Sequence, residues 1–110
     1  MAVRRVAAYT PEQVRRLQQQ VRLRDHNRCV VHGTAGAEVH ELLQRSSGRT
    51  RSVAIFRIEH MACVCSVCHY AIHHGSDKRR INRQIYIVLI SRFGYEYDKK
   101  TVEFYQLEMT

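Results

Sequence analysis

The chain has 110 residues and a single proline, which fits one small domain over residues 1–110. Eighteen Lys and Arg residues against ten Asp and Glu give a formal charge of +8. Most of these cations are arginine, the side chain suited to forked contacts with phosphate, so a polyanion is the expected partner. No apolar run is long enough to cross a membrane and no secretory signal pattern is visible, so we expect a cytoplasmic protein with no membrane partner.

The first predicted element is a helix over residues 10–24. Thr10 can cap it, Pro11 suits the first helical position, and Gln13 completes a capping box. A narrow apolar face formed by Val14, Leu17 and Val21 predicts a surface helix. Its arginines then face solvent or phosphate, and Arg15 is a candidate DNA contact.

Two short pairs of soft ligands follow, Cys29-x-x-His32 and Cys65-x-x-Cys68. Cysteines in a chain without an export signal are typical of metal ligands in a reducing compartment. A structural zinc takes four protein ligands, so the sequence predicts one structural Zn²⁺ held by Cys29, His32, Cys65 and Cys68, with Gly33 allowing a tight turn. Cys63 could replace Cys65, but the spacing favours Cys65 and leaves Cys63 as a small buried apolar residue.

The segment between the two pairs is expected to form strands. Residues 37–43 predict a short strand in which Glu38 and His40 share one face and Val39 takes the other. Residues 44–52 contain no apolar side chain and predict a basic loop, whose Arg45, Arg49 and Arg51 are either DNA contacts or parts of a solvated turn. A second strand is expected over residues 53–58, and a turn over residues 59–62.

The last third is expected to be mostly helical, which makes the fold class α+β. A helix should begin around Cys65 to Cys68 and end at Gly75, with His69 and His73 on one face. Ser76 and Asp77 should cap another helix that ends at Gly94, although residues 85–90 also suit a strand. Residues 95–109 predict one or two short strands, with a hairpin turn at residues 98–100.

Taken together, residues 24–75 resemble the HNH endonucleases of the ββα-metal finger class, in the form stapled by a structural zinc. The resemblance rests on three motifs: Arg24-Asp25-His26-Asn27-Arg28-Cys29, Glu38-Val39-His40-Glu41-Leu42, and Cys65-Ser66-Val67-Cys68-His69-Tyr70-Ala71-Ile72-His73. It implies a ββα-metal core over residues 25–75, flanked by an N-terminal helix at 10–24 and by a C-terminal helix and short strands at 76–110. The flanks are similar to the extensions of small phage or mobile-element members.

The resemblance also implies roles for the histidines. His60 stands at the position of the family's middle asparagine, and the family's doublet of a metal ligand and a base is here His40-Glu41. Two assignments are open: His40 is the catalytic base and Glu41 a ligand of the catalytic metal, or His40 is the ligand and Glu41 stands at the base position. The pKa of an ordinary carboxylate is a poor match for a base at neutral pH, which favours the first. Because Glu41 should face away from His40 in a strand, Glu38 could substitute for it. His73 is the second expected metal ligand, with His69 as a further candidate.

The implied activity is hydrolysis of DNA phosphodiester bonds with a catalytic divalent metal, Mg²⁺ or Mn²⁺, giving nicks or double-strand breaks. A phage terminase is a candidate protein partner, because small phage members of the family assist one. The competing hypothesis is a catalytically inactive, zinc-stapled module that binds nucleic acid. It is favoured by the altered residues Glu41 and His60.

Overall fold

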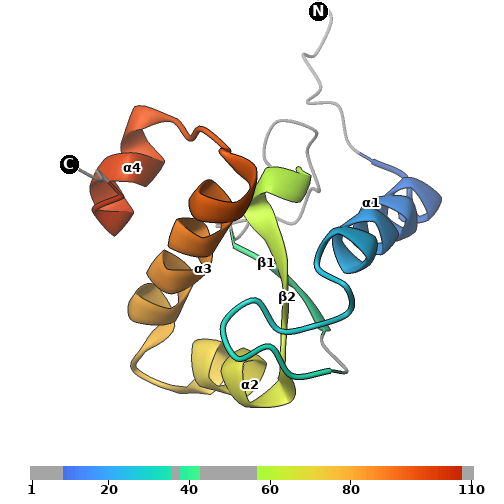
Figure 1. Ribbon diagram of the computed structural model, residues 1–110, viewed down its shortest axis with the longest axis horizontal. Coiled ribbons are helices and arrows are strands. Elements are labelled where there is room, and N and C mark those ends of the chain that lie inside the picture. The colour runs from blue at the N-terminus through green and yellow to red at the C-terminus, as the bar shows by residue number, and fades with distance from the viewer. Residues whose placement is uncertain (1–8, 36–37, 43–56, 108–110) are drawn as a thin grey trace, which may run out of the picture.

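The computed structural model describes residues 9–35, 38–42 and 57–107. In these ranges the fold is α+β, with a two-stranded antiparallel sheet between helices (Figure 1). In chain order the elements are α1 (Pro11–Arg24), β1 (Glu38–Glu41), the 3-10 turn η1 (Ile58–His60), β2 (Met61–Val64), α2 (Ser66–His74), α3 (Lys78–Phe93) and α4 (Lys99–Tyr105).

The first helix forms as its sequence predicts. The hydroxyl of Thr10 accepts a hydrogen bond from the backbone N–H of Gln13, and the side chain of Gln13 accepts one from the N–H of Thr10. This capping box satisfies two N–H groups that would otherwise lack partners at the helix start. Val14 and Val21 are buried, and Leu17 packs beside them.

The sheet pairs His40 with Ala62 and Glu41 with Met61. All four residues of β2 are buried, because each face of the strand is covered by a different layer. Met61 and Cys63 belong to the apolar cluster that includes α1, whereas Ala62 and Val64 belong to the cluster that includes α2 and α3. Figure 1 shows the two strands running between α1 on one side and α3 on the other.

Two predicted elements differ from the structure. The second strand is β2 at Met61–Val64, where a turn was expected, while residues 53–56 of the predicted strand lie outside the described ranges. Residues 95–107 contain helix α4 instead of strands. That helix begins because the carboxylate of Asp98 accepts a hydrogen bond from the N–H of Thr101 at 2.8 Å. The aromatic residues on either side suggested strands instead, so this helix cap was not predicted from the sequence.

The predicted ends of α2 and α3 are confirmed. Gly75 caps the end of α2, and Gly94 caps α3 with a φ of 67°, a left-handed conformation that glycine adopts without strain. The segment 85–90 is helical throughout, which decides between the two alternatives for it.

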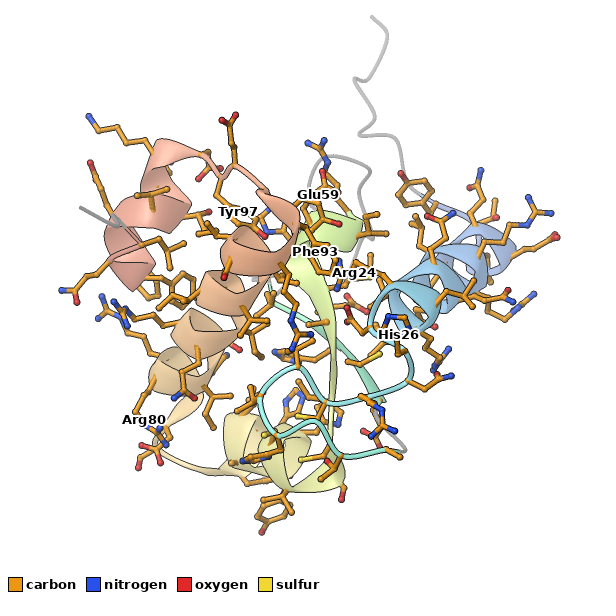
Figure 2. All side chains as sticks on the ribbon, in the orientation of Figure 1. Arg24, His26, Glu59, Arg80, Phe93 and Tyr97 are labelled. Carbon is orange, nitrogen blue, oxygen red and sulfur yellow. The ribbon has the colours of Figure 1, made fainter. Side chains whose placement is uncertain are left out.

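Arg24 was expected to face solvent, and this prediction is wrong. Its guanidinium forms an ion pair with Asp25, donates to the carbonyl oxygens of Ile58 (2.8 Å) and Met61 (2.6 Å), and lies over the ring of Phe93 (Figure 2). The carboxylate of Asp25 also accepts from the N–H of Cys63 at 2.9 Å. This buried pair therefore joins the end of α1 to the start of β2.

Within the described residues, no helix combines the length and the apolar character needed to span a membrane.

Candidate metal centres

Four predicted ligands meet at one end of α2. We call Cys29, His32, Cys65 and Cys68 the cysteine group, and their ligand atoms all lie within 4.8 Å of one another. Nδ1 of His32 lies 3.2 Å from Sγ of Cys68 and 3.3 Å from Sγ of Cys65, and the Sγ atoms of Cys29 and Cys68 are 3.9 Å apart. Ligands of a tetrahedral zinc lie roughly 3.3 to 3.8 Å apart, so this group could hold a structural metal such as zinc.

The chain around each pair is shaped like a metal-binding turn. The N–H of His32 points at Sγ of Cys29 (3.4 Å), and the N–H of Cys68 points at Sγ of Cys65 (3.5 Å). Gly33 has a φ of 74°, and its N–H donates to the carbonyl oxygen of Cys29. Cys65 is at the same time the N-cap of α2, so the second turn is continuous with that helix.

The thiols titrate unevenly without a metal. Burial, together with the neighbouring Cys65 and Cys29, raises the pKa of Cys68 to about 12. For Cys65, burial opposes ionisation, but hydrogen bonds from Cys68 and His32 outweigh it and lower the pKa to about 6. A cation among the sulfurs would favour every thiolate at once.

Cys63 is not part of this group. It is fully buried in the α1 cluster and lies opposite Val39 in the sheet. The expectation that it is a buried apolar residue is confirmed, and burial raises the pKa of its thiol to about 11.

A second set of ligands lies further along α2. The imidazoles of His40, His69 and His73, here called the histidine group, offer nitrogens within 4.8 Å of one another. The Nε2 atoms of His69 and His73 are 3.0 Å apart, the separation of two nitrogens about 2.1 Å from one octahedral ion. His40 is buried, whereas His73 is exposed, so the group opens toward solvent on one side.

Two of these imidazoles are oriented by polar partners. Nε2 of His40 lies 3.1 Å from Oδ1 of Asn82 on α3, and Nδ1 of His69 donates to the carboxylate of Glu38. These contacts leave Nδ1 of His40 and Nε2 of His69 as the nitrogens available to a cation. A histidine that binds a metal usually donates its other N–H to an oxygen in this way. The arrangement therefore fits a metal site with three protein ligands and open positions, the kind found in catalytic centres.

The electrostatics favour the neutral form of His40 and His73. Burial is the main reason that the pKa of His40 is lowered to about 4; the contact with Asn82 opposes this shift, and the charges of His69, His73 and Lys78 contribute to it. Burial also lowers the pKa of His73. Neutral imidazole is the form that binds metals, so the site is prepared for a cation at neutral pH.

The structure brings His73 and His69 to His40 but places the other expected catalytic residues elsewhere. Glu41 alternates with His40 along β1 and pairs with Met61, which packs toward α1, so strand geometry places it on the opposite face. Nδ1 of His60 lies 3.0 Å from the hydroxyl of Tyr86, and neither His60 nor Glu41 belongs to the metal-binding groups among the described residues. The assignment of His40 as a ligand therefore fits the geometry better than the assignment of Glu41 as one.

None of the candidate DNA contacts is placed beside the histidine group by the described residues. Arg15 is exposed on α1, across the sheet from the histidine group, and Arg45, Arg49 and Arg51 lie outside the described residues. Lys78, at the start of α3, is a cation whose charge acts on His40 and His73, and sequence reasoning assigned it no role. Asn82 was also missed, although it is the single polar residue among Ile85, Tyr86 and Leu89 on the buried face of α3.

Comparisons with protein-family models, with curated proteins and with solved structures found no match for this chain. The protein is thus an α+β protein whose described residues include one four-ligand group that could hold zinc and one three-histidine group.

Proposed function

We propose that the protein is a metal-dependent endonuclease that hydrolyses phosphodiester bonds in DNA, with His40, His69 and His73 holding the catalytic cation. The observation that carries the proposal is the histidine group itself: three converging imidazoles, two of them oriented by Glu38 and Asn82. A structural metal would need a fourth ligand, whereas three ligands leave room for a substrate oxygen.

The order of elements supports the same proposal. The antiparallel strands β1 and β2 are followed directly by α2, and the two candidate metal groups lie along this unit. This is the order expected from the resemblance to zinc-stapled HNH endonucleases. The net charge of +8 adds an attraction for the DNA backbone that requires no particular base sequence.

The chain's own residues would act by position. His40 is fixed by Asn82 from α3, and His69 is fixed by Glu38 from β1, so the cation site is rigid before any substrate arrives. A cation held there would supply Lewis-acid stabilisation of the charge that develops on the phosphate. Lys78, whose charge is felt by His40 and His73, would add positive potential beside the scissile group.

The donor set also bears on which cation is used. Three imidazoles suit zinc, nickel, iron or copper, whereas Mg²⁺ prefers carboxylates and water. The resemblance leads to an expectation of Mg²⁺ or Mn²⁺; we propose instead that a transition metal with a stronger preference for nitrogen ligands occupies this site. Mn²⁺ accepts mixed nitrogen and oxygen ligands more readily than Mg²⁺ does, so it belongs in the same assay.

The test is conversion of supercoiled plasmid to nicked and linear forms. His73→Ala should abolish cutting with every divalent ion, because it removes one of three ligands. His74→Ala is the matched control, since His74 is the next residue of the same helix and is absent from the histidine group.

The competing hypothesis, a DNA-binding module without activity, has its own signature. It predicts that the wild-type protein retards DNA in a gel and that no added metal produces nicks. Its structural support is the placement of Glu41 and His60 away from the histidine group. Cutting by the wild type and by His74→Ala, but not by His73→Ala, would exclude it.

A further inference from the structure

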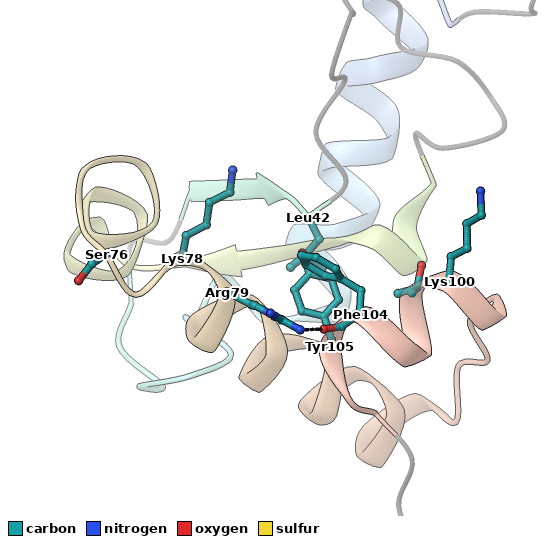
Figure 3. Close-up of a pocket in the computed structure, with 8 residues that line it drawn as sticks. Leu42, Ser76, Lys78, Arg79, Lys100, Phe104 and Tyr105 are labelled. Atoms are coloured by element: carbon teal, nitrogen blue, oxygen red, sulfur yellow. Dashed lines mark hydrogen bonds between the residues drawn. The ribbon is translucent and has the colours of Figure 1, made fainter.

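A cavity of about 650 Å³ lies between the end of β1, the start of α3 and helix α4 (Figure 3). It is formed by Leu42 of the predicted ββα core and by residues that follow that core in the chain, and it contains no residue of the histidine or cysteine groups. Sequence reasoning assigned it no role, partly because α4 was expected to be a pair of strands.

The lining combines two kinds of surface. Leu42, Phe104 and Tyr105 supply apolar and aromatic walls, and Lys78, Arg79 and Lys100 supply positive charge. The described residues that line the cavity include no Asp or Glu. A ligand that fills it should therefore be flat and apolar in one part and anionic in another.

The aromatic part is accessible. Phe104 is 54% exposed, so part of its ring is open to solvent. The guanidinium of Arg79 lies over its ring, 4.4 Å from the centroid, and donates to the carbonyl oxygen of Phe104. Nucleic-acid bases stack on both kinds of plane, aromatic rings and arginine guanidinium groups.

The cavity adjoins the histidine group. Leu42 follows His40 by two residues, and both are buried on the α3 side of the sheet. Lys78 lines the cavity, and its charge also acts on His40 and His73, so it lies near both the cavity and the histidine group. A nucleotide in the cavity would thus be a close neighbour of a phosphate at the histidine group.

We propose that this cavity binds one unpaired nucleotide of the DNA strand, with its base stacked on Phe104 and its phosphate held by Lys78, Arg79 and Lys100. The inference rests on the proposed function, because it takes the neighbouring phosphate to be the one bound at the histidine group. It goes beyond that function because it assigns a preference for single-stranded or locally opened DNA. A base inside an intact duplex cannot reach a pocket without leaving the stack.

The chain lacks tryptophan, which permits a direct test by fluorescence. Phe104→Trp places a unique fluorophore at the proposed stacking position, and a short single-stranded oligonucleotide of deoxyadenosine is added to the zinc-loaded protein without a further divalent metal. Stacking should quench the emission in a saturable way, and a duplex of matched length should quench it far less. Phe93→Trp is the control, because Phe93 is also an exposed ring beneath an arginine but lies at the other end of α3.

Affinity measurements extend the test. Phe104→Leu should weaken binding of the oligonucleotide by roughly five- to a hundredfold, the range for loss of one base–aromatic stack. Phe93→Leu should change it by no more than about twofold, as expected for a surface substitution. Lys100→Gln should reduce the salt dependence of binding by about 0.7 in the logarithmic slope, the value for one lost phosphate contact to a single strand.

The outcomes separate this inference from the proposed hydrolysis. Equal quenching of the two tryptophan variants, equal quenching by duplex and single strand, or unchanged emission from Phe104→Trp would each overturn the nucleotide pocket. If the wild type cuts plasmid and Phe104→Trp is not quenched, only the pocket is wrong. Quenching without any cutting would support the pocket and contradict the hydrolysis.

Discussion

Oδ1 of Asn82 lies 3.1 Å from Nε2 of His40, and both side chains are almost completely buried. The other half of the amide, Nδ2 of Asn82, has no hydrogen-bond partner among the residues that the structure describes. A buried donor without a partner costs stability, so the residue is better explained by what it does for His40 than by what it adds to the fold.

The first prediction follows from this contact. Asn82→Leu removes the acceptor and the unpaired donor together, so it should leave the free energy of unfolding equal or higher, yet weaken metal binding at the histidine group by about 10- to 100-fold. Asn82→Asp keeps an oxygen in place and should retain metal binding. Isothermal titration of the zinc-loaded protein with a second equivalent of metal measures both, and equal affinity in all three proteins would contradict the role.

The second prediction concerns the cysteine group. His32→Ala removes one of four ligands and should weaken zinc binding by more than about a hundredfold, with a fall in melting temperature of at least 4 °C for each kcal/mol lost. His32→Cys should restore tight binding, because zinc accepts four thiolates equally well. Chelator competition followed by thermal unfolding reports both quantities. A chain that melts at the same temperature with and without zinc would show that the group is not structural.

The third prediction concerns the buried pair beside Cys63. Asp25→Ala leaves the guanidinium of Arg24 without its carboxylate and the N–H of Cys63 without an acceptor. Breaking such a pair should cost about 3–5 kcal/mol of unfolding free energy. Asp77→Ala removes an exposed carboxylate that pairs with Arg80, and should cost less than about 1 kcal/mol. Urea unfolding of both variants at one zinc concentration would test the difference, which should vanish if the Arg24 pair contributes nothing.

The fourth prediction is a pH dependence. The pKa of His40 falls from 6.5 to about 4 on folding, so the unfolded chain binds the extra proton more readily than the folded chain. The contribution of His40 to the free energy of unfolding is therefore fully present above pH 6.5. It is lost as the pH falls toward 4, by about 3 kcal/mol in all. His40→Asn lacks this titration, so the loss of unfolding free energy between pH 7 and pH 4.5 should be smaller in the variant. Identical losses would place the titrating group elsewhere.

Much of the fold was predictable from local chemistry. The capping residues of α1, the glycines after α2 and α3, and the two pairs of soft ligands each carry a signal that acts within a few residues. The sequence also predicted that Glu38 and His40 share a face, and the structure confirms it through their contacts with His69 and the α3 side of the sheet.

What was missed depends on tertiary contacts. β2 is buried on both faces and only four residues long, so its sequence lacks the alternation of polar and apolar residues that identifies a strand. For the same reason, its pairing with β1 could not be predicted. Tyr95 and Tyr97 suggested strands before α4. In the structure they are not in a strand, and their rings pack against Phe93 and Tyr86 respectively. Asn82 could have been noticed as a polar residue at helical spacing within an apolar stripe, but only the fold shows that it meets His40.

Helix α2 supplies ligand atoms to both candidate centres: Cys68 to one and the adjacent His69 to the other, with Cys65 at its cap and His73 one turn on. The two centres consequently share a single ordering event, the formation of a nine-residue helix that would be marginal by itself. By thermodynamic linkage, a metal that orders the cysteine group would raise the affinity of the histidine group for its cation, and the reverse would hold by the same factor. Under the proposed function, loading of the structural centre would therefore prepare the proposed catalytic centre to bind its metal.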